Sequence, residues 1–162
     1  MHCTTRDIDT PLGRYTLAAT AEGLTHVQLA GSPKLPQESG DADSDASCHL
    51  DTAQRALHEY FAGERTGFAD LALSPSGSPF QKRVWDALQS IPFGRTASYG
   101  EIARRIGRDS AARAVGSANH NNPLGIVVPC HRVIGAGGQL TGYAGGLSRK
   151  RWLLSHEGVD ED

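Results

Sequence analysis

A cysteine, a histidine and an arginine stand side by side in residues 127–133, which read Val-Val-Pro-Cys-His-Arg-Val. A thiol is a poor nucleophile until it loses its proton, and nearby positive charge lowers its pKa. His131 and Arg132 directly follow Cys130 and are the groups that could supply this charge. The alternative is a buried structural cysteine, because free cysteines are among the most buried residues in proteins.

The residues around Cys130 predict how it is held. Two β-branched residues favour a strand, and Pro129 removes a donor from the strand ladder. We therefore expect a strand that ends where Cys130 begins. Adjacent side chains on a strand diverge, so proton transfer from Cys130 to His131 would need a bend or a bridging water. Glu157 is a candidate third group that orients His131; the alternative is a surface carboxylate near a helix C-terminus, where the helix dipole disfavours it.

Length and composition are those of an ordinary globular chain. With 162 residues it corresponds to one domain or two small ones. No apolar run approaches the ~20 residues of a membrane span, and the N-terminal residues lack an apolar signal core. We therefore expect a cytoplasmic protein without a membrane partner, associated with the nucleoid if the source is bacterial.

The cysteines indicate neither a disulfide framework nor a metal site. There are three, Cys3, Cys48 and Cys130, and an odd count in a reducing compartment argues against paired thiols. Cys48 and His49, taken with His2 and Cys3, suggest a metal site at first sight. No Cys-x-x-Cys or His-x-x-x-His spacing supports it. We expect no metal and no cofactor.

Charge is distributed unevenly within the formal net charge of −2. Residues 1–76 carry 5 Lys/Arg against 11 Asp/Glu, whereas residues 77–156 carry 11 against 3. A basic block inside a mildly acidic protein is typical of a face that binds a polyanion. The alternative is a solvated surface with a chance imbalance.

The first half of the chain predicts an α/β arrangement. Residues 1–30 show partial alternation punctuated by turn residues and predict a β-meander. The polar stretch 31–48 holds too few apolar groups to pack, so we expect a mobile acidic loop. Residues 51–62 have helical spacing, and residues 68–73 are compatible with another short strand. The segment 74–77, Ser-Pro-Ser-Gly, is a candidate linker.

The second half is punctuated by helix caps. Residues 78–81, Ser-Pro-Phe-Gln, and residues 98–101, Ser-Tyr-Gly-Glu, each predict a capping box that opens a helix. A further helix is expected from about Ser110 to Asn119. The last helix is expected to begin with Ser148 as its cap and to end at Gly158 in the C′ position.

Two helices joined by a short turn over residues 98–119 fit a helix-turn-helix. The second helix presents small side chains, and Arg113 is its one long side chain. Major-groove readout needs Arg, Asn or Gln that reach base edges, whereas a smooth surface suits close approach to a backbone or a minor groove. Arg113 would then project alone toward the base stack. The alternative is an ordinary helix buried through its alanines.

Residues 135–146 are rich in glycine and raise the question of phosphate binding. The spacing Gly-x-Gly-x-x-Gly is absent and no Lys-Ser/Thr follows, so a nucleotide site is not expected. We expect instead a flexible or closely approached wall of a pocket near Tyr143.

Four stretches together resemble the O6-alkylguanine-DNA alkyltransferase family, and the match is dense from about residue 78 to residue 158. They are Pro129-Cys130-His131-Arg132-Val133, Asn122-Pro123, Gly142-Tyr143-Ala144-Gly145-Gly146 and His156-Glu157-Gly158. The resemblance implies an α+β N-terminal domain, residues 1–76, made of a small β-meander plus helix and ribonuclease H-like. It implies a mainly helical, winged-helix-like C-terminal domain, residues 77–162, that binds DNA through a helix-turn-helix and accepts the alkyl group.

The activity that the resemblance implies is that of a methylated-DNA–protein-cysteine S-methyltransferase. Cys130 would take the alkyl group irreversibly, in a single turnover, from O6-alkylguanine and less readily from O4-alkylthymine in double-stranded DNA. His131 would deprotonate the thiol through a water, and Glu157 would fix the imidazole. Asn122 would be a buried bridge between the recognition helix and the active-site turn. Tyr99 would protonate or hydrogen-bond N3 of the leaving guanine.

The resemblance also implies minor-groove binding and nucleotide flipping, because an alkylguanine inside a duplex cannot meet a thiolate. Arg113 would fill the gap that the extruded nucleotide leaves. The expected DNA contacts are Thr96, Ser98, Ala112, Arg113, Ala114, Gly116, Ser117 and Arg132. The expected pocket residues are Gly125, Val133, Tyr143, Ala144 and Gly145.

The chain departs from many relatives at three places in this region. Ala144 stands where many carry serine, so one side-chain donor to the base is missing. Gly125 replaces a proline of some members, which predicts a roomier pocket that accepts larger alkyl groups. Residues 119–121, Asn-His-Asn, differ at the end of the recognition helix.

Three other functions compete with this interpretation. A non-catalytic lesion-binding relative would lack the cysteine, which this chain keeps. A helix-turn-helix regulator with a sensor cysteine would be a dimer with a base-reading helix. A thiol hydrolase would need turnover, whereas a thioether at Cys130 is not readily hydrolysed. We therefore expect a monomeric repair protein, with cooperative binding on DNA left open.

Overall fold

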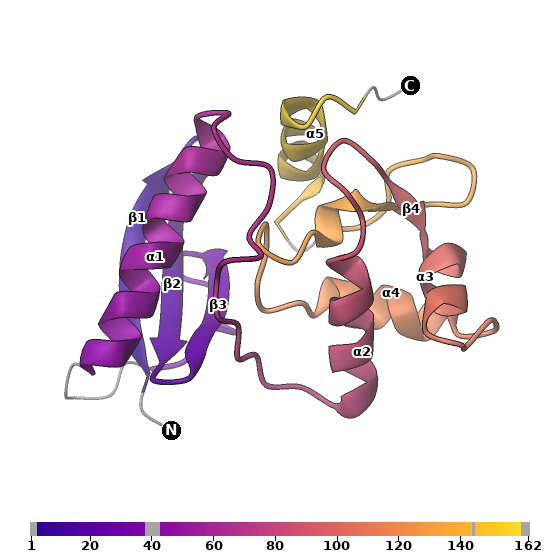
Figure 1. Ribbon diagram of the computed structural model, residues 1–162. Helices are drawn as coiled ribbons and strands as arrows, with labels where there is room; N and C mark the ends of the chain where they lie inside the picture. Colours follow the sequence, from indigo (N-terminus) through magenta and orange to yellow (C-terminus); the bar gives the residue numbers. More distant parts are fainter. Residues whose placement is uncertain (1–2, 38–42, 144, 160–162) are drawn as a thin grey trace. The chain divides into compact units, whose positions relative to one another are not determined.

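The structure is a computed structural model that describes residues 3–37, 43–143 and 145–159. The chain divides into two compact units, Met1–Ser76 and Gly77–Asp162. The first is an antiparallel sheet with a long helix, and the second is mainly helical (Figure 1). This confirms the predicted fold class.

The sheet of the first unit has the strand order β1-β2-β3, with β1 at Thr4–Thr10, β2 at Gly13–Thr20 and β3 at Gly23–Leu29. Both pairings are antiparallel, as the predicted meander requires. Residues Tyr15 to Thr20 of the central strand are all buried, so β2 forms the middle of this core. Gly23 permits a close approach, because a Cβ there would stand 2.7 Å from the carbonyl oxygen of Ala72.

The helix α1, Ser44–Phe61, lies along one face of the sheet (Figure 1). It begins earlier than the sequence predicted, because the Asp43 carboxylate accepts hydrogen bonds from the backbone N–H groups of Asp45 and Ala46. Residues 44–48 are therefore the first turn of a helix and not part of a loop. Residues 38–42 of the expected loop lie outside the described residues. The helix buries Ala46, Leu50, Ala53, Ala56, Leu57 and Tyr60.

The strand predicted at residues 68–73 is wrong. The segment after α1 pairs with the sheet through a single bridge between Leu73 and Leu24. Two backbone hydrogen bonds hold it there, Leu24 N–H to Ala72 O at 2.9 Å and Ser74 N–H to Leu24 O at 2.8 Å. One bridge at the edge of β3 fixes the segment without extending the sheet.

The second unit contains four α-helices among its described residues. These are α2 at Pro79–Leu88, α3 at Tyr99–Arg105, α4 at Ala112–His120 and α5 at Leu147–His156. Both predicted capping boxes are confirmed, with Ser78 and Gln81 closing the start of α2 and Ser98 and Glu101 that of α3. The helices α2, α3 and α4 pack against one another, and the indole N–H of Trp85 donates to Ala118 O at 2.9 Å. The pair α3–α4 forms the expected helix-turn-helix.

The prediction for the start of α5 is wrong, and the one for its end is confirmed. Gly146, with φ 93°, is the N-cap, so Ser148 lies inside the helix. At the other end Gly158 has φ 82°. The N–H groups of Gly158 and Val159 donate to Ser155 O at 3.0 Å and Leu154 O at 2.9 Å, which is a Schellman motif.

A short parallel pairing links the helix-turn-helix to the segment after Cys130. Strand β4, Ala97–Ser98, pairs with β5, Val133–Ile134. The start of α3 is thereby fixed to the chain three residues beyond Cys130. In the described part of the chain, no helix has the length and apolar character that crossing a membrane requires.

Candidate active site

Cys130 begins a single 3-10 turn, η1, Cys130–Arg132, and is 4% exposed. The strand expected before it is absent from this described segment. The chain turns instead: Val127 N–H donates to Gly125 O at 2.8 Å and Cys130 N–H to Val128 O at 2.7 Å. Backbone N–H and C=O groups of residues 122–130 hydrogen-bond to one another and to Asn122, and not to a partner strand.

Asn122 organises this turn from inside. Its amide donates to Val128 O at 2.9 Å and accepts from Leu124 N–H at 3.0 Å. Burial raises the pKa of the Cys130 thiol, and a hydrogen bond from Asn122 acts against that shift. Asn119, at the end of α4, donates to Cys130 O at 3.4 Å. The end of α4 and the cysteine turn are therefore tied by two buried amides, of which the sequence predicted only Asn122.

The structure brings His131 and Glu157 together as predicted. The distance from His131 Nε2 to Glu157 Oε2 is 2.8 Å, and both side chains are fully buried. The imidazole nitrogen that hydrogen-bonds to a carboxylate carries the proton. In a neutral imidazole the other nitrogen is then an acceptor. This other atom, Nδ1, is buried and has no hydrogen-bond partner among the described residues. Burial lowers the pKa of His131 against the opposing effect of Glu157, which favours the neutral form that can take a proton.

Arg132 lies in this buried array and not on a DNA-facing surface, so the expected DNA contact does not fit its position. Its Nε donates to Glu157 Oε1 at 2.7 Å, its Nη2 to Oε2 at 3.0 Å and its Nη1 to Ile91 O at 2.7 Å. Its guanidinium also stacks 5.9 Å from the centroid of the Phe93 ring. With 6% exposure it has no free edge for a phosphate.

The pKa of Glu157 reflects these contacts. Burial alone would raise it, but the hydrogen bonds and charges of His131 and Arg132 outweigh burial and lower the pKa to about 2. Glu157 is therefore a carboxylate at any physiological pH. The alternative, a surface carboxylate at the end of α5, is wrong, because Glu157 is only 4% exposed.

Lys150 is a buried cation near the thiol that sequence reasoning missed. Its ammonium donates to Val133 O at 2.6 Å and to Thr141 O at 3.1 Å, and the residue is fully buried. Burial lowers its pKa to about 8, and the Cys130 thiolate acts against that shift. Burial raises the pKa of Cys130, whereas Asn122 and Lys150 lower it. The available signal was its spacing, because Lys150 precedes Leu153 and Leu154 by three and four residues on the buried face of α5.

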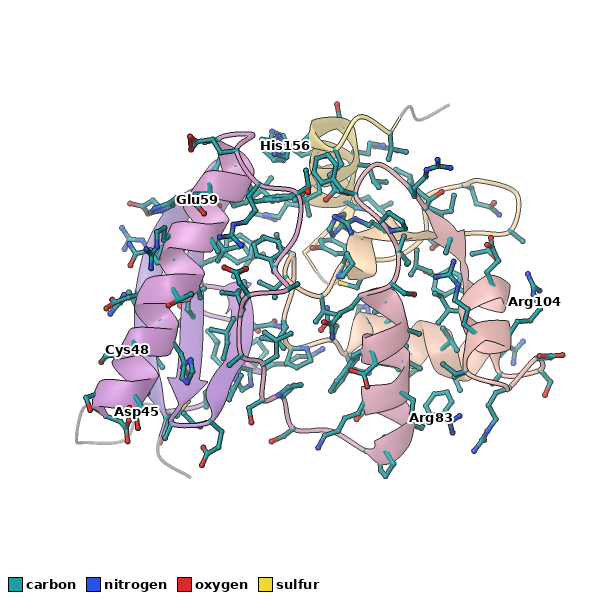
Figure 2. All side chains as sticks on the ribbon, viewed as in Figure 1. Asp45, Cys48, Glu59, Arg83, Arg104 and His156 are labelled. Atoms are coloured by element: carbon teal, nitrogen blue, oxygen red, sulfur yellow. The ribbon has the colours of Figure 1, made fainter. Side chains whose placement is uncertain are left out.

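The expected DNA-contact residues other than Arg132 lie on or next to α3 and α4. Arg113, Ala114 and Ser117 are exposed on α4, while Ala112 and Gly116 are half-buried. Arg113 forms no hydrogen bond or ion pair with another described residue. Thr96 and Ser98 are half-buried before α3, and the Ser98 hydroxyl is engaged as the cap. Arg104, labelled in Figure 2, adds a further exposed cation on α3.

The expected pocket residues have mixed environments. Val133 is buried in β5, whereas Tyr143, Gly145 and Gly125 are half-buried. A Cβ on Gly145 would stand 2.8 Å from the Tyr143 ring, so the glycine lets this ring lie close to the backbone. Ala144 lies outside the described residues.

Neither Cys3 nor Cys48 belongs to a metal-binding cluster of described residues. Cys3 is buried with its sulfur 4.0 Å from the Thr25 hydroxyl, and Cys48 is exposed on α1 (Figure 2). Among residues 3–37, 43–143 and 145–159, no group of three or more His, Cys, Asp or Glu residues could hold a metal ion.

Comparison with known proteins agrees with this geometry. Residues 79–159 match the family model of the 6-O-methylguanine DNA methyltransferase DNA-binding domain, and residues 1–75 match that of its ribonuclease-like domain. The chain therefore belongs to the 6-O-methylguanine DNA methyltransferase family. The resemblance found in the sequence is confirmed.

Individual relatives are similar over nearly the whole chain. It is 51% identical over 152 residues to the methylated-DNA–protein-cysteine methyltransferase of Mycolicibacterium paratuberculosis, covering 94% of this chain and 90% of that protein. The protein of the same name from Methanosarcina acetivorans is 50% identical over 151 residues, covering 93% and 95%. The crystal structure of Mycobacterium tuberculosis OGT in complex with DNA is 48% identical, with a TM-score of 0.84 and coverage of 97% and 92%.

Proposed function

We propose that this protein repairs DNA by moving the alkyl group of an O6-alkylguanine to Cys130 in one irreversible step. The observation that carries the proposal is the buried Cys130 turn, held beside an Arg132–Glu157–His131 array in a chain of the methyltransferase family. The names of the relatives and the DNA complex of a similar protein support the same activity.

The chemistry begins at the thiol. His131 Nδ1 accepts the proton of Cys130 through one water, and Glu157 stabilises the imidazolium that results. Lys150 and Asn122 stabilise the thiolate, which offsets part of the cost of burying it. Sγ then attacks the alkyl carbon, an S–C bond forms and the C–O6 bond breaks.

The leaving base must depart without charge to leave easily. Tyr99 is placed by β4 and α3 near the chain that follows Cys130 and supplies the hydrogen bond to N3 of guanine. The base takes a proton from Tyr99 and leaves as neutral guanine. The proton that the thiol gave to His131 returns to the Tyr99 oxygen through solvent, so no proton is gained or lost overall. The thioether on Cys130 has no route back to a thiol, so each molecule reacts once.

Binding to DNA uses the surface of α4. Its small residues, Ala112, Ala114, Gly116 and Ser117, let the helix approach a minor groove closely. Extruding the nucleotide costs a few kcal/mol. Arg113, exposed and without a partner among the described residues, occupies the gap and offsets part of that cost. Residues 77–162 thus form the DNA-binding and alkyl-acceptor domain, and the site of action is the chromosomal DNA.

We expect Val133, Tyr143 and Gly145 to line the acceptor pocket, with Gly125 on the chain that leads to Cys130. Because Gly125 carries no side chain, we expect the pocket to admit a benzyl group. Free O6-benzylguanine should therefore react readily with Cys130. A protein that takes methyl from a duplex but is inert to O6-benzylguanine would contradict the roomy pocket.

The direct test is to incubate the protein with a duplex that contains one O6-methylguanine. The peptide that contains Cys130 should gain the mass of one methyl group. The matched control is Cys130→Ser, which should keep its affinity for DNA and take up no methyl group. Methylation of another residue, or transfer by Cys130→Ser, would overturn the proposal.

A further inference from the structure

Thr141 lies outside the motifs that define the site, yet it contacts the phenol of Tyr99. The Tyr99 hydroxyl and the Thr141 hydroxyl are 2.5 Å apart, which joins the start of α3 to the glycine-rich segment. Gly116 of α4 lies beside the ring of Tyr99, because a Cβ built there would stand 3.7 Å from two ring carbons. The contact with the Thr141 hydroxyl therefore determines where the phenol oxygen lies.

The backbone of Thr141 is held as firmly as its side chain. Lys150 Nζ bonds Thr141 O at 3.1 Å and Val133 O at 2.6 Å, so one buried ammonium clamps the two chain segments together. Val133 is in turn paired with Ala97 in the β4–β5 ladder, two residues before Tyr99. A closed circuit of contacts therefore runs from Tyr99 through Thr141, Lys150 and Val133 back to Tyr99.

We propose that Thr141 is a positioning residue that directs the hydroxyl proton of Tyr99 toward the leaving guanine. This inference rests on the proposed function. A phenol has one proton to donate, and its oxygen can accept at the same time. When the Thr141 hydroxyl donates to Tyr99 Oη, the proton of Tyr99 stays available for the base. The bond is between neutral groups, so it sets direction without adding charge.

A purely structural role would give a different pattern of effects, so the test uses two substitutions at the same position. Thr141→Val removes the hydroxyl and keeps the β-branched shape and the carbonyl that Lys150 holds. Thr141→Ser keeps the hydroxyl. We expect Thr141→Val to slow single-turnover transfer from an O6-methylguanine duplex about tenfold, a part of the 10²–10⁴-fold that a positioned proton donor contributes. Thr141→Ser should restore the rate to within about twofold of the parent.

Two further measurements separate positioning from loop stability. Alkylation of Cys130 by iodoacetamide needs no proton donor for a base, so its rate should be the same in Thr141→Val and the parent. In a Tyr99→Phe background, Thr141→Val should cause no additional loss, because the group on which it acts is gone.

Several results would overturn the inference. These are an unchanged transfer rate in Thr141→Val, an equal slowing of iodoacetamide, or losses that multiply in the double variant. The parent protein in the same assay distinguishes this failure from that of the proposed function. If the parent transfers methyl to Cys130 and the variants behave in one of these ways, only the role of Thr141 is refuted. If the parent transfers none, the proposed function and the role of Thr141 are both refuted.

Discussion

In the proposed mechanism, Glu157 is the side chain that orients His131, the base that deprotonates Cys130. It accepts hydrogen bonds from His131 and from two nitrogens of Arg132, all in a buried setting. Because its pKa is lowered to about 2, it stays ionised and keeps the proton of neutral His131 on Nε2. The acceptor nitrogen Nδ1 is thereby defined before substrate arrives. Arg132 in turn holds the Glu157 carboxylate in place through two hydrogen bonds.

Glu157→Gln should destabilise the protein by about 3–5 kcal/mol at pH 7, because Arg132 is left as a buried charge without its counter-ion. The pKa of Glu157 falls on folding from an ordinary 4.5 to about 2. Its contribution is therefore fully present above pH 4.5 and is lost as pH falls toward 2. Urea unfolding of the parent and Glu157→Gln at several pH values should show a gap that narrows over this interval. A gap that is independent of pH would contradict the assignment.

Lys150→Met should slow the reaction of Cys130 with iodoacetamide at neutral pH. The buried ammonium lowers the pKa of the thiol, so removing it should move the half-maximal rate to higher pH. The control is Arg151→Met, which removes an exposed cation one residue further along α5. Identical pH profiles for the parent and Lys150→Met would show that the charge of Lys150 does not reach the thiol.

At the residue level, sequence predicts identities better than environments. The structure brings together four residues as expected, because the motif that predicted them also implies their contacts: Cys130, His131, Glu157 and Asn122. The environment of Arg132 was predicted wrongly, since nothing local tells whether an arginine beside a cysteine faces solvent or a carboxylate 25 residues away. Lys150 and Thr141 were missed because their partners are backbone carbonyls and a distant phenol.

In the proposed function the helix α4 is the element that meets DNA, and this role is separable from the chemistry. Arg113→Ala should reduce the rate of repair in a duplex by about tenfold or more, since the extruded nucleotide leaves an unfilled gap worth about 1–3 kcal/mol of stacking. The rate with free O6-benzylguanine should be unchanged, because a free base needs no extrusion. Single-turnover kinetics on both substrates check this. Equal losses on the two would refute insertion of Arg113.

Helix caps give a matched test of the fold itself. Ser78→Ala should cost about 1 kcal/mol of unfolding free energy, because the hydroxyl accepts the N–H of Gln81 at the start of α2. Ser148→Ala should change stability by less than about 0.5 kcal/mol, because Ser148 lies inside α5 and is exposed. Urea titrations of both variants measure the difference. Equal costs would mean that Ser148 does act as a cap.

Elements with local signals were predicted well, and those set by distant partners were not. The two capping boxes and the C-terminal glycine of α5 are read within four residues of sequence. The strand expected before Cys130 failed because β-propensity depends on a partner strand. Here the amide of Asn122 takes the Val128 carbonyl at 2.9 Å instead. The sequence did not predict the early start of α1. The polar composition of residues 44–48 favoured a loop, but the Asp43 cap starts the helix there.

At the scale of the whole molecule, charge and chemistry coincide in one unit. Residues 77–156 hold 11 of the 16 Lys and Arg residues, along with the thiol and the helix-turn-helix. Two of these cations, Arg132 and Lys150, are buried and hold the structure together. Counting charges in the sequence therefore overestimates how many cations can contact phosphate. Exposed cations such as Arg113 and Arg104 remain for that role.

The central claim is that Cys130 is consumed as a reagent. The most direct measurement is the number of methyl groups removed per protein molecule when an O6-methylguanine duplex is supplied in large excess. We predict a plateau at one equivalent, however long the incubation, with every methyl group on Cys130. Continued demethylation beyond one equivalent, or a plateau reached without modification of Cys130, would contradict the account.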